Sequence, residues 1–306
     1  MVAIADAVRW TAADQPLFAD DPPDRFPAAA PLILPRVAEL VRDVARAEIL
    51  PRFRGVRADR KPDGSLVTEA DVAAQMALER GLQSIVPCPV VGEEMLESEQ
   101  RRLWQAGGWC WCIDPLDGTG NFVNGKPYFG VSVALTHDRV TQLAVILDPS
   151  ANELFAAVRG QTATLNGTPL TLGDVSRTLR NARAEAGLYK KLGRLKHALI
   201  AEAPFAQLSM SGASVLQWCH LAAGRYDVFV HPGENPWDYA AGALILESAG
   251  GKLCTFTHDD YWADPAWHRS AIAATNAALF APWRDWVRRQ LEVDATEAAL
   301  SHTQVA

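Results

Sequence analysis

Carboxylate side chains occur at four places in this sequence where a strand or loop gives way to the next element. They are Asp71 after LVT, Glu93 and Glu94 after PVV, Asp114 and Asp117 after WCWCI, and Asp238 after GENPW. In α/β folds the ends of strands are where chemical groups are usually exposed. A cluster of carboxylate oxygens with no histidine or cysteine beside it suits Mg²⁺ better than Zn²⁺. The sequence therefore predicts a magnesium site.

The segment DPLDGT, from Asp114 to Thr119, has a spacing that fits a metal-binding turn. Pro115 restricts the backbone after Asp114, and Gly118 permits dihedral angles that other residues rarely adopt. The two aspartates and the Leu116 carbonyl can then face one point. A helix is expected to begin at Gly118 and Thr119, and the free N–H groups of a helix N-terminus attract phosphate. Metal and phosphate are thus expected to meet at one place.

Each motif also has an interpretation without chemistry. GEE alone is usually a solvated loop, WD is usually a helix cap beside a core tryptophan, and TEAD is an ordinary capping sequence. DPLDGT is harder to explain as a simple turn, because it fixes two aspartates, a proline and a glycine ahead of a helix. The combination of motifs favours catalysis.

The elements that would position these residues are a mixture of helices and strands. The first half is predicted to hold an amphipathic helix from about 34 to 53, a helix from about 69 to 85, strands at PVV and WCWCID with a charged helix near 97–105 between them, and an antiparallel meander over 129–137, 140–148 and 152–158. The second half is predicted to hold a basic helix near 174–197, a helix at 214–223, the strand YDVFV, a helix at 238–249, and strands near 252 and 272. This pattern predicts a layered α/β fold.

The predicted organisation is a single domain over residues 31–292, with a metal-binding half to about 168 and a C-terminal half from about 169. Residues 1–30, rich in Pro, Asp and Ala, are interpreted as an extension without regular structure, and residues 293–306 as a polar tail. A chain of 306 residues, 49% of them hydrophobic, is long enough to bury a large core.

Charge and cysteine content narrow the class of protein. The chain has 29 basic and 36 acidic residues, a net charge of -7 and no basic block, which favours neither nucleic acid nor an anionic membrane as partner. No apolar run is long enough for a membrane-spanning helix, and the first residues do not form a signal peptide. Five cysteines without a secretory signal indicate reduced thiols and a cytoplasmic location. Cys110 and Cys112 alternate with tryptophans and are interpreted as part of a buried strand.

Three motifs resemble, in order, those of the inositol monophosphatase-like family of metal-dependent phosphatases. They are GEE, which contains Glu93 and Glu94, DPLDGTGNF (114–122) and PWDYAAGALILESAGG (236–251). DGSLVTEAD (63–71) and the pair Asn166-Gly167 also match, and the resemblance covers roughly residues 35–280. It implies an αβαβα sandwich of the inositol monophosphatase and fructose-1,6-bisphosphatase type, usually homodimeric, with Mg²⁺ as activator and Li⁺ as inhibitor.

Carried over residue by residue, the resemblance implies two or three Mg²⁺ ions. Their ligands would be Glu93, Asp114 and the Leu116 carbonyl for the first ion, Asp114, Asp117 and Asp238 for the second, and Glu93 with water for a weaker third. The implied reaction is in-line attack of a metal-activated water on phosphorus, without a phosphoenzyme.

The resemblance also implies catalytic and substrate-binding residues. The catalytic groups would be Asp71 and Thr119, which position and help to deprotonate the attacking water, together with Glu93. The substrate, a small phosphate monoester, would be held by Asp117, Gly118, Thr119, Gly212, Ala213, His231 and Asp238.

The substrate side departs from the family pattern. Members that act on inositol phosphate often carry an acidic residue seven positions before the WD aspartate, where this chain has His231, although an internal shift in HPGENPWD would bring Glu234 there. His231 could bond a hydroxyl or a second anionic group, or could be a strand-end histidine without a role. Gly120 replaces a second threonine, and MSGAS (210–214) stands where the family often has VGTA.

The predicted function is a Mg²⁺-dependent phosphomonoesterase acting on an inositol-1-phosphate-type substrate. Histidinol phosphatase, 3′-phosphoadenosine-5′-phosphate phosphatase and fructose-1,6-bisphosphatase are alternatives on the same scaffold. A haloacid dehalogenase-type phosphatase fits poorly, because DPLD places its carboxylates one residue too far apart for the D-x-D pattern. A non-catalytic partner of the transcription machinery is an alternative from a different class, although no predicted ligand is missing.

Overall fold

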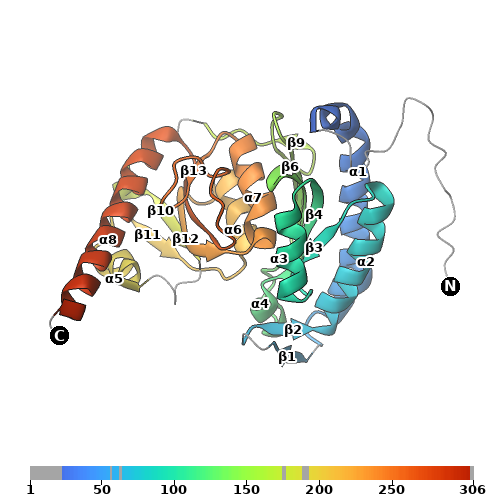
Figure 1. Cartoon of the computed structure of the whole chain (residues 1–306), viewed down its shortest axis with the longest axis horizontal. Coiled ribbons are helices and arrows are strands. Elements are labelled where there is room, and N and C mark those ends of the chain that lie inside the picture. Colours follow the sequence, from blue (N-terminus) through green and yellow to red (C-terminus); the bar gives the residue numbers. More distant parts are fainter. Residues whose placement is uncertain (1–22, 56, 62–63, 174–176, 188–192, 304–306) are drawn as a thin grey trace.

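Five layers of helices and sheets make up the fold, which confirms the predicted αβαβα sandwich (Figure 1). The computed structural model describes residues 23–55, 57–61, 64–173, 177–187 and 193–303. Its α-helices are α1 (Phe26–Val44), α2 (Glu69–Ile85), α3 (Glu97–Ala106), α4 (Thr119–Val123), α5 (Gly193–Ala201), α6 (Ser214–Ala222), α7 (Pro236–Ser248) and α8 (Ala277–Thr303). In Figure 1, α1 and α2 lie at one side, α6 and α7 in the middle, and α5 and α8 at the other side.

Two large sheets separate these helical layers. Within the described residues, one sheet has the order β3-β4-β5-β6-β7-β8-β9. Its strands are β3 (Val90–Gly92), β4 (Trp109–Asp117), β5 (Gly130–His137), β6 (Val140–Asp148), β7 (Glu153–Val158), β8 (Thr164–Leu165) and β9 (Thr168–Pro169). Strand β3 pairs with β4 in parallel, whereas β4 to β7 are antiparallel neighbours, as the predicted meander requires for β5 to β7.

The other large sheet has the order β11-β10-β12-β14-β13. Its strands are β10 (Arg183–Ala186), β11 (Gln207–Ser209), β12 (Val228–Glu234), β13 (Lys252–Cys254) and β14 (Arg269–Ala274). A separate hairpin of β1 (Ala58–Arg60) and β2 (Leu66–Thr68) precedes α2. The Asp114–Asp117 end of β4 and the start of α7 thus come from neighbouring layers of the sandwich.

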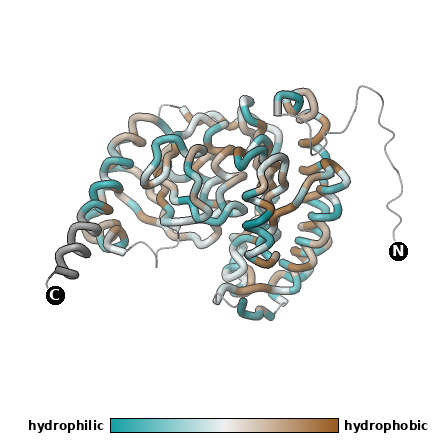
Figure 2. The backbone as a smooth tube through the Cα atoms, viewed as in Figure 1, coloured by the Kyte–Doolittle hydropathy of each residue, from teal (hydrophilic) through white to brown (hydrophobic). Residues whose placement is uncertain are grey.

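Alternating side chains of β4 contribute to two different cores. Trp109, Trp111 and Ile113 belong to the hydrophobic cluster that includes α1 and α2, while Cys110 and Cys112 belong to the cluster around α6 and α7. This is the period of two expected of a strand buried on both faces. All five cysteines of the chain are buried free thiols, so the interpretation of the WCWC run as a buried strand is confirmed. Figure 2 shows that hydrophobic and hydrophilic residues are interspersed along the tube at the outer helices α1 and α2.

Helix α1 begins earlier than predicted. It starts at Phe26, so residues 26–30 are helical and not part of an irregular extension, and its last turns change to a π-helix at Ala45–Ile49 and a 3₁₀ turn at Leu50–Arg52. Proline is tolerated in the first turn of a helix, and burial of Phe26 against Trp109, with ring centroids 5.4 Å apart, favours the longer helix. Within the rest of the predicted extension, Pro23–Arg25 form a 3₁₀ turn, and residues 1–22 lie outside the described residues.

The predicted basic helix near 174–197 is wrong. Residues Arg183–Ala186 form β10, an inner strand that pairs with both β11 and β12, and the α-helix described in this segment is α5, over Gly193–Ala201. Ala and Glu favour helices locally, but burial of Ala184 and Ala186 in the core under α5 and α8 outweighs that preference.

The C-terminal residues also differ from the prediction of a polar tail, because α8 continues to Thr303. The division into one domain with two halves stays a prediction.

Candidate active site

A cavity of about 460 Å³ is lined by most of the predicted site residues. They are Glu93, Asp114, Leu116, Asp117, Gly118, Thr119, Gly212, His231 and Asp238. Two predicted residues do not line it: Asp71 lies behind Thr119, and Ala213 is fully buried at the start of α6. The walls come from both sheets, since Asp114 belongs to β4, Ala186 to β10 and His231 to β12.

Asp114, Asp117 and Asp238 form the centre of the cavity wall. Each offers one carboxylate oxygen, and these three oxygens lie within 4.8 Å of one another. The sheet register shifts between Asp114 and Asp117, which is a bulge that re-aims the two side chains at the end of β4. The sequence motif and the fold therefore place three carboxylates within reach of one cation.

Neighbouring N–H groups hold the three aspartates in place. The Leu116 N–H donates to Asp114 Oδ1 at 2.9 Å, and the Val215 N–H at the start of α6 donates to Asp117 Oδ2 at 2.8 Å. The Asn235 N–H donates to Asp238 Oδ2 at 3.0 Å, as part of the capping box that starts α7. Asp238 is thus a helix cap and a site residue at once, so the two interpretations of its motif are compatible.

Burial and mutual repulsion make this group unfavourable for negative charge. Burial raises the pKa of Asp114 well above its ordinary value, and the charges of Glu93, Asp117 and Asp238 raise it further. Burial likewise raises the pKa of Asp117 to about 7 and that of Asp238 well above its ordinary range. A bound divalent cation reverses this balance, because it favours the charged forms. The donors are all oxygen atoms, so they fit Mg²⁺.

The same pKa shifts predict how the metal-free protein responds to pH. A carboxyl group whose pKa is raised by folding stabilises the folded state below its unfolded pKa, near 4, and this stabilisation is lost as the pH rises through the folded value, about 7 for Asp117. We therefore expect the metal-free protein to lose stability between about pH 4 and 7. Mg²⁺ binds the charged forms, so it should raise the melting temperature more at pH 7.5 than at pH 5.

Thermal melts with EDTA and with Mg²⁺ at both pH values check this expectation. At about 100 times its dissociation constant, an ion bound at a single site adds about 2.7 kcal/mol to the free energy of unfolding. An equal Mg²⁺ shift at pH 5 and pH 7.5 would contradict the assignment of buried carboxylates as its ligands.

Glu93 and Glu94 hold a lysine at the edge of the cavity. The Lys61 ammonium group lies 2.8 Å from Glu93 Oε1 and 2.8 Å from Glu94 Oε1. Burial opposes the charge of Lys61, but the two carboxylates outweigh it and raise its pKa. Burial and the nearby Glu93 raise the pKa of Glu94 to about 7. Glu93 lines the cavity with the three aspartates but lies outside their 4.8 Å group, and its carboxylate is paired with a cation of the chain itself.

Asp71 connects to the cavity through Thr119. Its Oδ2 atom accepts the Thr68 N–H at 2.8 Å, and the Thr68 side chain accepts a backbone N–H of the helix, which together make the capping box of α2. The Thr68 hydroxyl also donates to Asp71 Oδ2. The other oxygen, Oδ1, lies 3.1 Å from the Thr119 hydroxyl, which also lies 3.1 Å from the Leu116 carbonyl. Asp71 is fully buried, and burial raises its pKa despite the hydrogen bonds from Thr68. The pair can therefore pass a proton from the cavity, at Thr119 Oγ1, to Asp71 Oδ1.

Gly118 allows the chain to turn between β4 and α4. Its φ of +84° favours glycine, and a Cβ atom there would lie 2.9 Å from the Ala213 Cβ and 3.0 Å from the Tyr128 carbonyl oxygen.

We expect Gly118→Ala to destabilise the protein by about 3 kcal/mol or more, since it adds a clash to backbone strain. Gly160→Ala is the matched control, because Gly160 has a φ of +81° and open space around it. Chemical denaturation measures the free energy of unfolding of both variants. An equal loss of stability in the two variants would show that the packing around Gly118 is not tight.

His231, and not Glu234, lines the substrate side of the cavity. The His231 ring packs against Gly187, where an added Cβ would lie 1.9 Å from its Cδ2 atom, and its Nδ1 accepts the Gly233 N–H at 3.2 Å. Glu234 is fully buried beside α6 and accepts hydrogen bonds from the Ser214 hydroxyl and the Trp218 indole N–H, and burial raises its pKa to about 8. Of the two residues, the structure therefore places only His231 at the cavity, and its contact with substrate stays a prediction.

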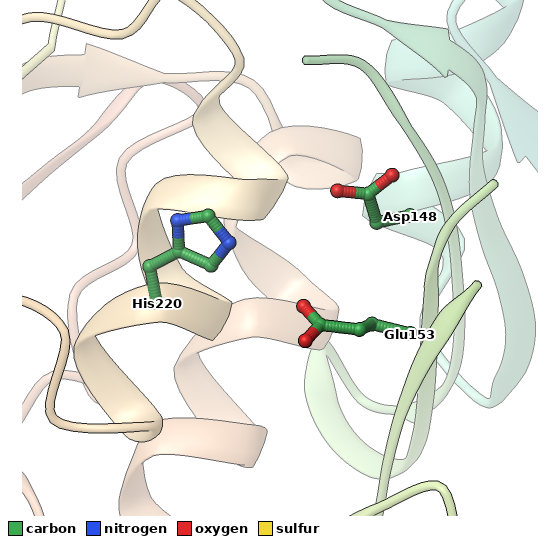
Figure 3. A group of neighbouring side chains, drawn as sticks. All are labelled: Asp148, Glu153 and His220. Carbon is green, nitrogen blue, oxygen red and sulfur yellow. The ribbon is translucent and has the colours of Figure 1, made fainter. Parts of the chain in front are cut away.

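A second acidic group lies outside this cavity. Asp148, Glu153 and His220 point toward one another from β6, β7 and α6 (Figure 3), with ligand atoms within 4.8 Å. However, Arg225 donates to both Glu153 oxygens, and its Nη1 lies 2.8 Å from His220 Nε2. Burial, with the Arg225 charge, lowers the pKa of His220 to about 4. The Arg225 guanidinium already occupies the Glu153 oxygens and lies beside His220, so we assign this group no metal.

Several lining residues were not among the predicted site residues, although Met210 and Ser214 belong to the MSGAS segment noted on the substrate side. These lining residues are Ser65, Ala186, Gly187, Met210, Ser214, Gln217, Asn235 and Trp237. For two of these residues, the sequence contained a feature from which a role could have been predicted. Asn235 stands three positions before Asp238, the spacing of a capping box, and Gln217 is the one polar residue in the apolar run VLQWC.

Comparison with known proteins agrees with the fold. The model of the inositol monophosphatase family matches residues 28–287, and the chain belongs to this family. A protein named Nus factor SuhB from Pseudomonas aeruginosa is 33% identical over 220 residues, which cover 68% of this chain and 79% of that protein. The Nus factor SuhB of Escherichia coli is 35% identical over 210 residues, covering 66% and 76%.

Solved structures show the same likeness. An IMPase from Thermotoga maritima has a TM-score of 0.74 and 26% identity, covering 85% of this chain and 98% of that one. The inositol monophosphatase of Anabaena has a TM-score of 0.65 and 26% identity, covering 85% and 93%. Among the described residues, no helix combines the length and apolar character that crossing a bilayer requires.

Proposed function

We propose that this protein is a Mg²⁺-dependent phosphomonoesterase that hydrolyses a small phosphorylated metabolite. The observation that carries the proposal is the group of Asp114, Asp117 and Asp238, whose carboxylate oxygens lie within 4.8 Å of one another in a cavity large enough for a small ester. Membership of the inositol monophosphatase family supports it. Mg²⁺ held here, with Glu93 and the Leu116 carbonyl as further ligands, would supply positive charge for the phosphate and activate water.

The residues of the chain would divide the remaining work. Thr119 Oγ1 lies at the cavity wall, where it orients the attacking water and accepts its proton, while the Thr119 hydroxyl proton passes to Asp71 Oδ1, 3.1 Å away. Gly118, whose missing side chain allows close packing against Ala213, turns the chain so that Thr119 begins α4 at the cavity wall. Asp117 is held by the Val215 N–H, which donates to Oδ2, and one oxygen of this carboxylate lies within 4.8 Å of an oxygen of each of the other two aspartates. No residue of the chain needs to form a bond to phosphorus.

We propose an ester of inositol-1-phosphate type as substrate. None of the described residues that line the cavity is Lys or Arg. A second phosphate, as in 3′-phosphoadenosine 5′-phosphate or fructose 1,6-bisphosphate, would find neither a lysine nor an arginine among them. The family also supports proposals of Li⁺ inhibition, a homodimer and two or three Mg²⁺ ions, and the reduced cysteines support a cytoplasmic location.

A phosphate-release panel with Mg²⁺ tests this function. It contains inositol 1-phosphate, histidinol phosphate, 3′-phosphoadenosine 5′-phosphate and fructose 1,6-bisphosphate, each with EDTA as the metal-free control. We expect release from inositol 1-phosphate that EDTA abolishes. Absence of release from all four would argue against the enzyme, and release only from a bisphosphate would overturn the substrate proposal.

A second candidate comes from the names of the relatives. Two similar proteins, from Pseudomonas aeruginosa and Escherichia coli, are named Nus factor SuhB, which supports a partner role beside the transcription machinery. A single variant, Asp114→Asn, distinguishes hydrolysis from the partner role. Asp114→Asn should abolish hydrolysis, and co-purification of RNA polymerase with both the variant and the unaltered protein would favour the partner role.

A further inference from the structure

Gln217 lines the cavity but takes no part in the proposed metal or phosphate site. It lies on α6, after the Val215 N–H that holds Asp117, and only 2% of its surface is exposed. The residues on either side of it, Leu216 and Trp218, are fully buried. A polar side chain at such a position requires partners for its amide group. Its contacts show which of its two polar atoms faces the cavity.

Glu185 fixes the orientation of the Gln217 amide. Glu185 is fully buried in β10, and its Oε1 atom lies 2.8 Å from the Ser211 N and 2.5 Å from the Gln217 Nε2. A backbone N–H can only donate, so Oε1 of Glu185 must be an acceptor. The Gln217 side chain therefore turns its N–H group toward Glu185. The opposite orientation would place a carbonyl oxygen against a carboxylate oxygen.

The carbonyl end of the amide is left for the cavity. Gln217 Nε2 also lies 3.3 Å from the Ser211 hydroxyl, whereas the side-chain oxygen makes no hydrogen bond with a described residue. This oxygen is not fully buried, so a group in the cavity can reach it. Nearby lining residues Ala186, Gly187 and Met210 offer no polar side chain. The wall at Gln217 thus presents a hydrogen-bond acceptor.

We propose that Gln217 is a specificity-determining residue whose side-chain carbonyl accepts a hydrogen bond from a hydroxyl group of the leaving alcohol, and that Glu185 is the positioning residue that fixes it. The inference rests on the proposed phosphatase function. The hydrogen bond to Gln217 selects single-phosphate esters of alcohols with a further hydroxyl near the ester. An alcohol without this hydroxyl leaves the carbonyl unpaired, and a second anionic group would meet the carbonyl and the carboxylate behind it.

Two esters with the same carbon skeleton test the proposal. Glycerol 2-phosphate carries two further hydroxyls, and isopropyl phosphate carries none. For the unaltered protein and each variant, kcat and KM are measured for both esters with Mg²⁺. The preference is the ratio of the two kcat/KM values, and comparison between variants cancels the intrinsic reactivity of the esters. A loss of folding or of metal would change both esters equally.

Gln217→Met removes the acceptor at similar volume. We expect it to lower kcat/KM for glycerol 2-phosphate by about 3- to 10-fold, mainly through KM, and to leave isopropyl phosphate unchanged within about 2-fold. The matched control is Gln142→Met in β6, outside the cavity, which should change neither ester. An unchanged preference in Gln217→Met, or an equal loss for both esters, overturns the inference and leaves the phosphatase proposal standing.

Variants at Glu185 test its positioning role. Glu185→Gln keeps an oxygen for the amide and should keep the preference, whereas Glu185→Met should lose it while still hydrolysing isopropyl phosphate. If melting shows that a methionine variant is unfolded, Gln217→Asn replaces it, and its shorter side chain should also lower the preference. A preference retained in that variant overturns the inference. If the unaltered protein hydrolyses neither ester, nor any ester of the panel, the phosphatase proposal falls and the inference falls with it.

Discussion

Asp114→Asn is expected to lower kcat by about 10³-fold or more without unfolding the protein. Asp114 faces both Asp117 and Asp238, so its carboxylate is in reach of any cation that they bind. The loss of several kcal/mol of transition-state stabilisation by metal accounts for this magnitude. Because burial and repulsion oppose the charge of Asp114, the metal-free variant should be as stable as the unaltered protein or more so. Phosphate release and thermal melting in EDTA measure the two effects.

The matched control for this variant is Asp148→Asn. Asp148 is also a buried aspartate with a pKa raised by burial, and it belongs to the other acidic group, where Oδ1 accepts the Ser150 and Ala151 N–H groups. An asparagine can still accept these hydrogen bonds, so activity should remain. Full activity in Asp114→Asn, or an equal loss in Asp148→Asn, would show that the metal is not held where we place it.

Thr119→Val is expected to lower kcat by about 10²- to 10⁴-fold, the usual range for loss of a positioned proton-transfer group. Valine keeps the shape of the side chain but removes the hydroxyl that lies 3.1 Å from Asp71 Oδ1. The aspartates are untouched, so Mg²⁺ binding should persist, in contrast to Asp114→Asn. Turnover and Mg²⁺ binding are measured on the same sample.

Thr119→Ser provides the control for the hydroxyl itself, and it should recover most of the activity. A valine variant with normal kcat would remove the Thr119 and Asp71 pair from the reaction. A variant that loses both turnover and Mg²⁺ binding would instead assign Thr119 to the metal site.

The capping boxes explain why two short motifs could be interpreted in two ways. Thr68 with Asp71 starts α2, and Asn235 with Asp238 starts α7. In the first, one carboxylate oxygen caps the helix and the other contacts Thr119. A cap fixes the direction of its carboxylate, so the same residue type and spacing serve both the local structure and the site.

Patterns within one element could be predicted from the sequence. The alternation in β4 and the sharp turn at Gly118 are local features, and the helix over residues 69–85 matches α2 in both bounds. The layered fold was predicted from the mixture of elements and the family motifs. The cluster of aspartates required segments more than 100 residues apart, and only the order of the family motifs suggested that they meet.

Features that depend on packing between distant segments could not be predicted. Strand β10 has a helix-favouring sequence and becomes a strand because β11 and β12 flank it. Ala213 was predicted to contact substrate, but it is fully buried and packs against Gly118, so its place in the substrate site stays a prediction without a described surface. Gln217 faces the cavity only because Glu185, 32 residues earlier, orients it.

The central claim is that Asp114, Asp117 and Asp238 hold Mg²⁺, and calorimetric titration at pH 7.5 tests it most directly. The account expects heat of Mg²⁺ binding to the unaltered protein and at least about 10-fold weaker binding to Asp114→Asn, with unchanged binding to Asp148→Asn. Absence of Mg²⁺ binding by the unaltered protein, or equal binding by Asp114→Asn, would contradict it.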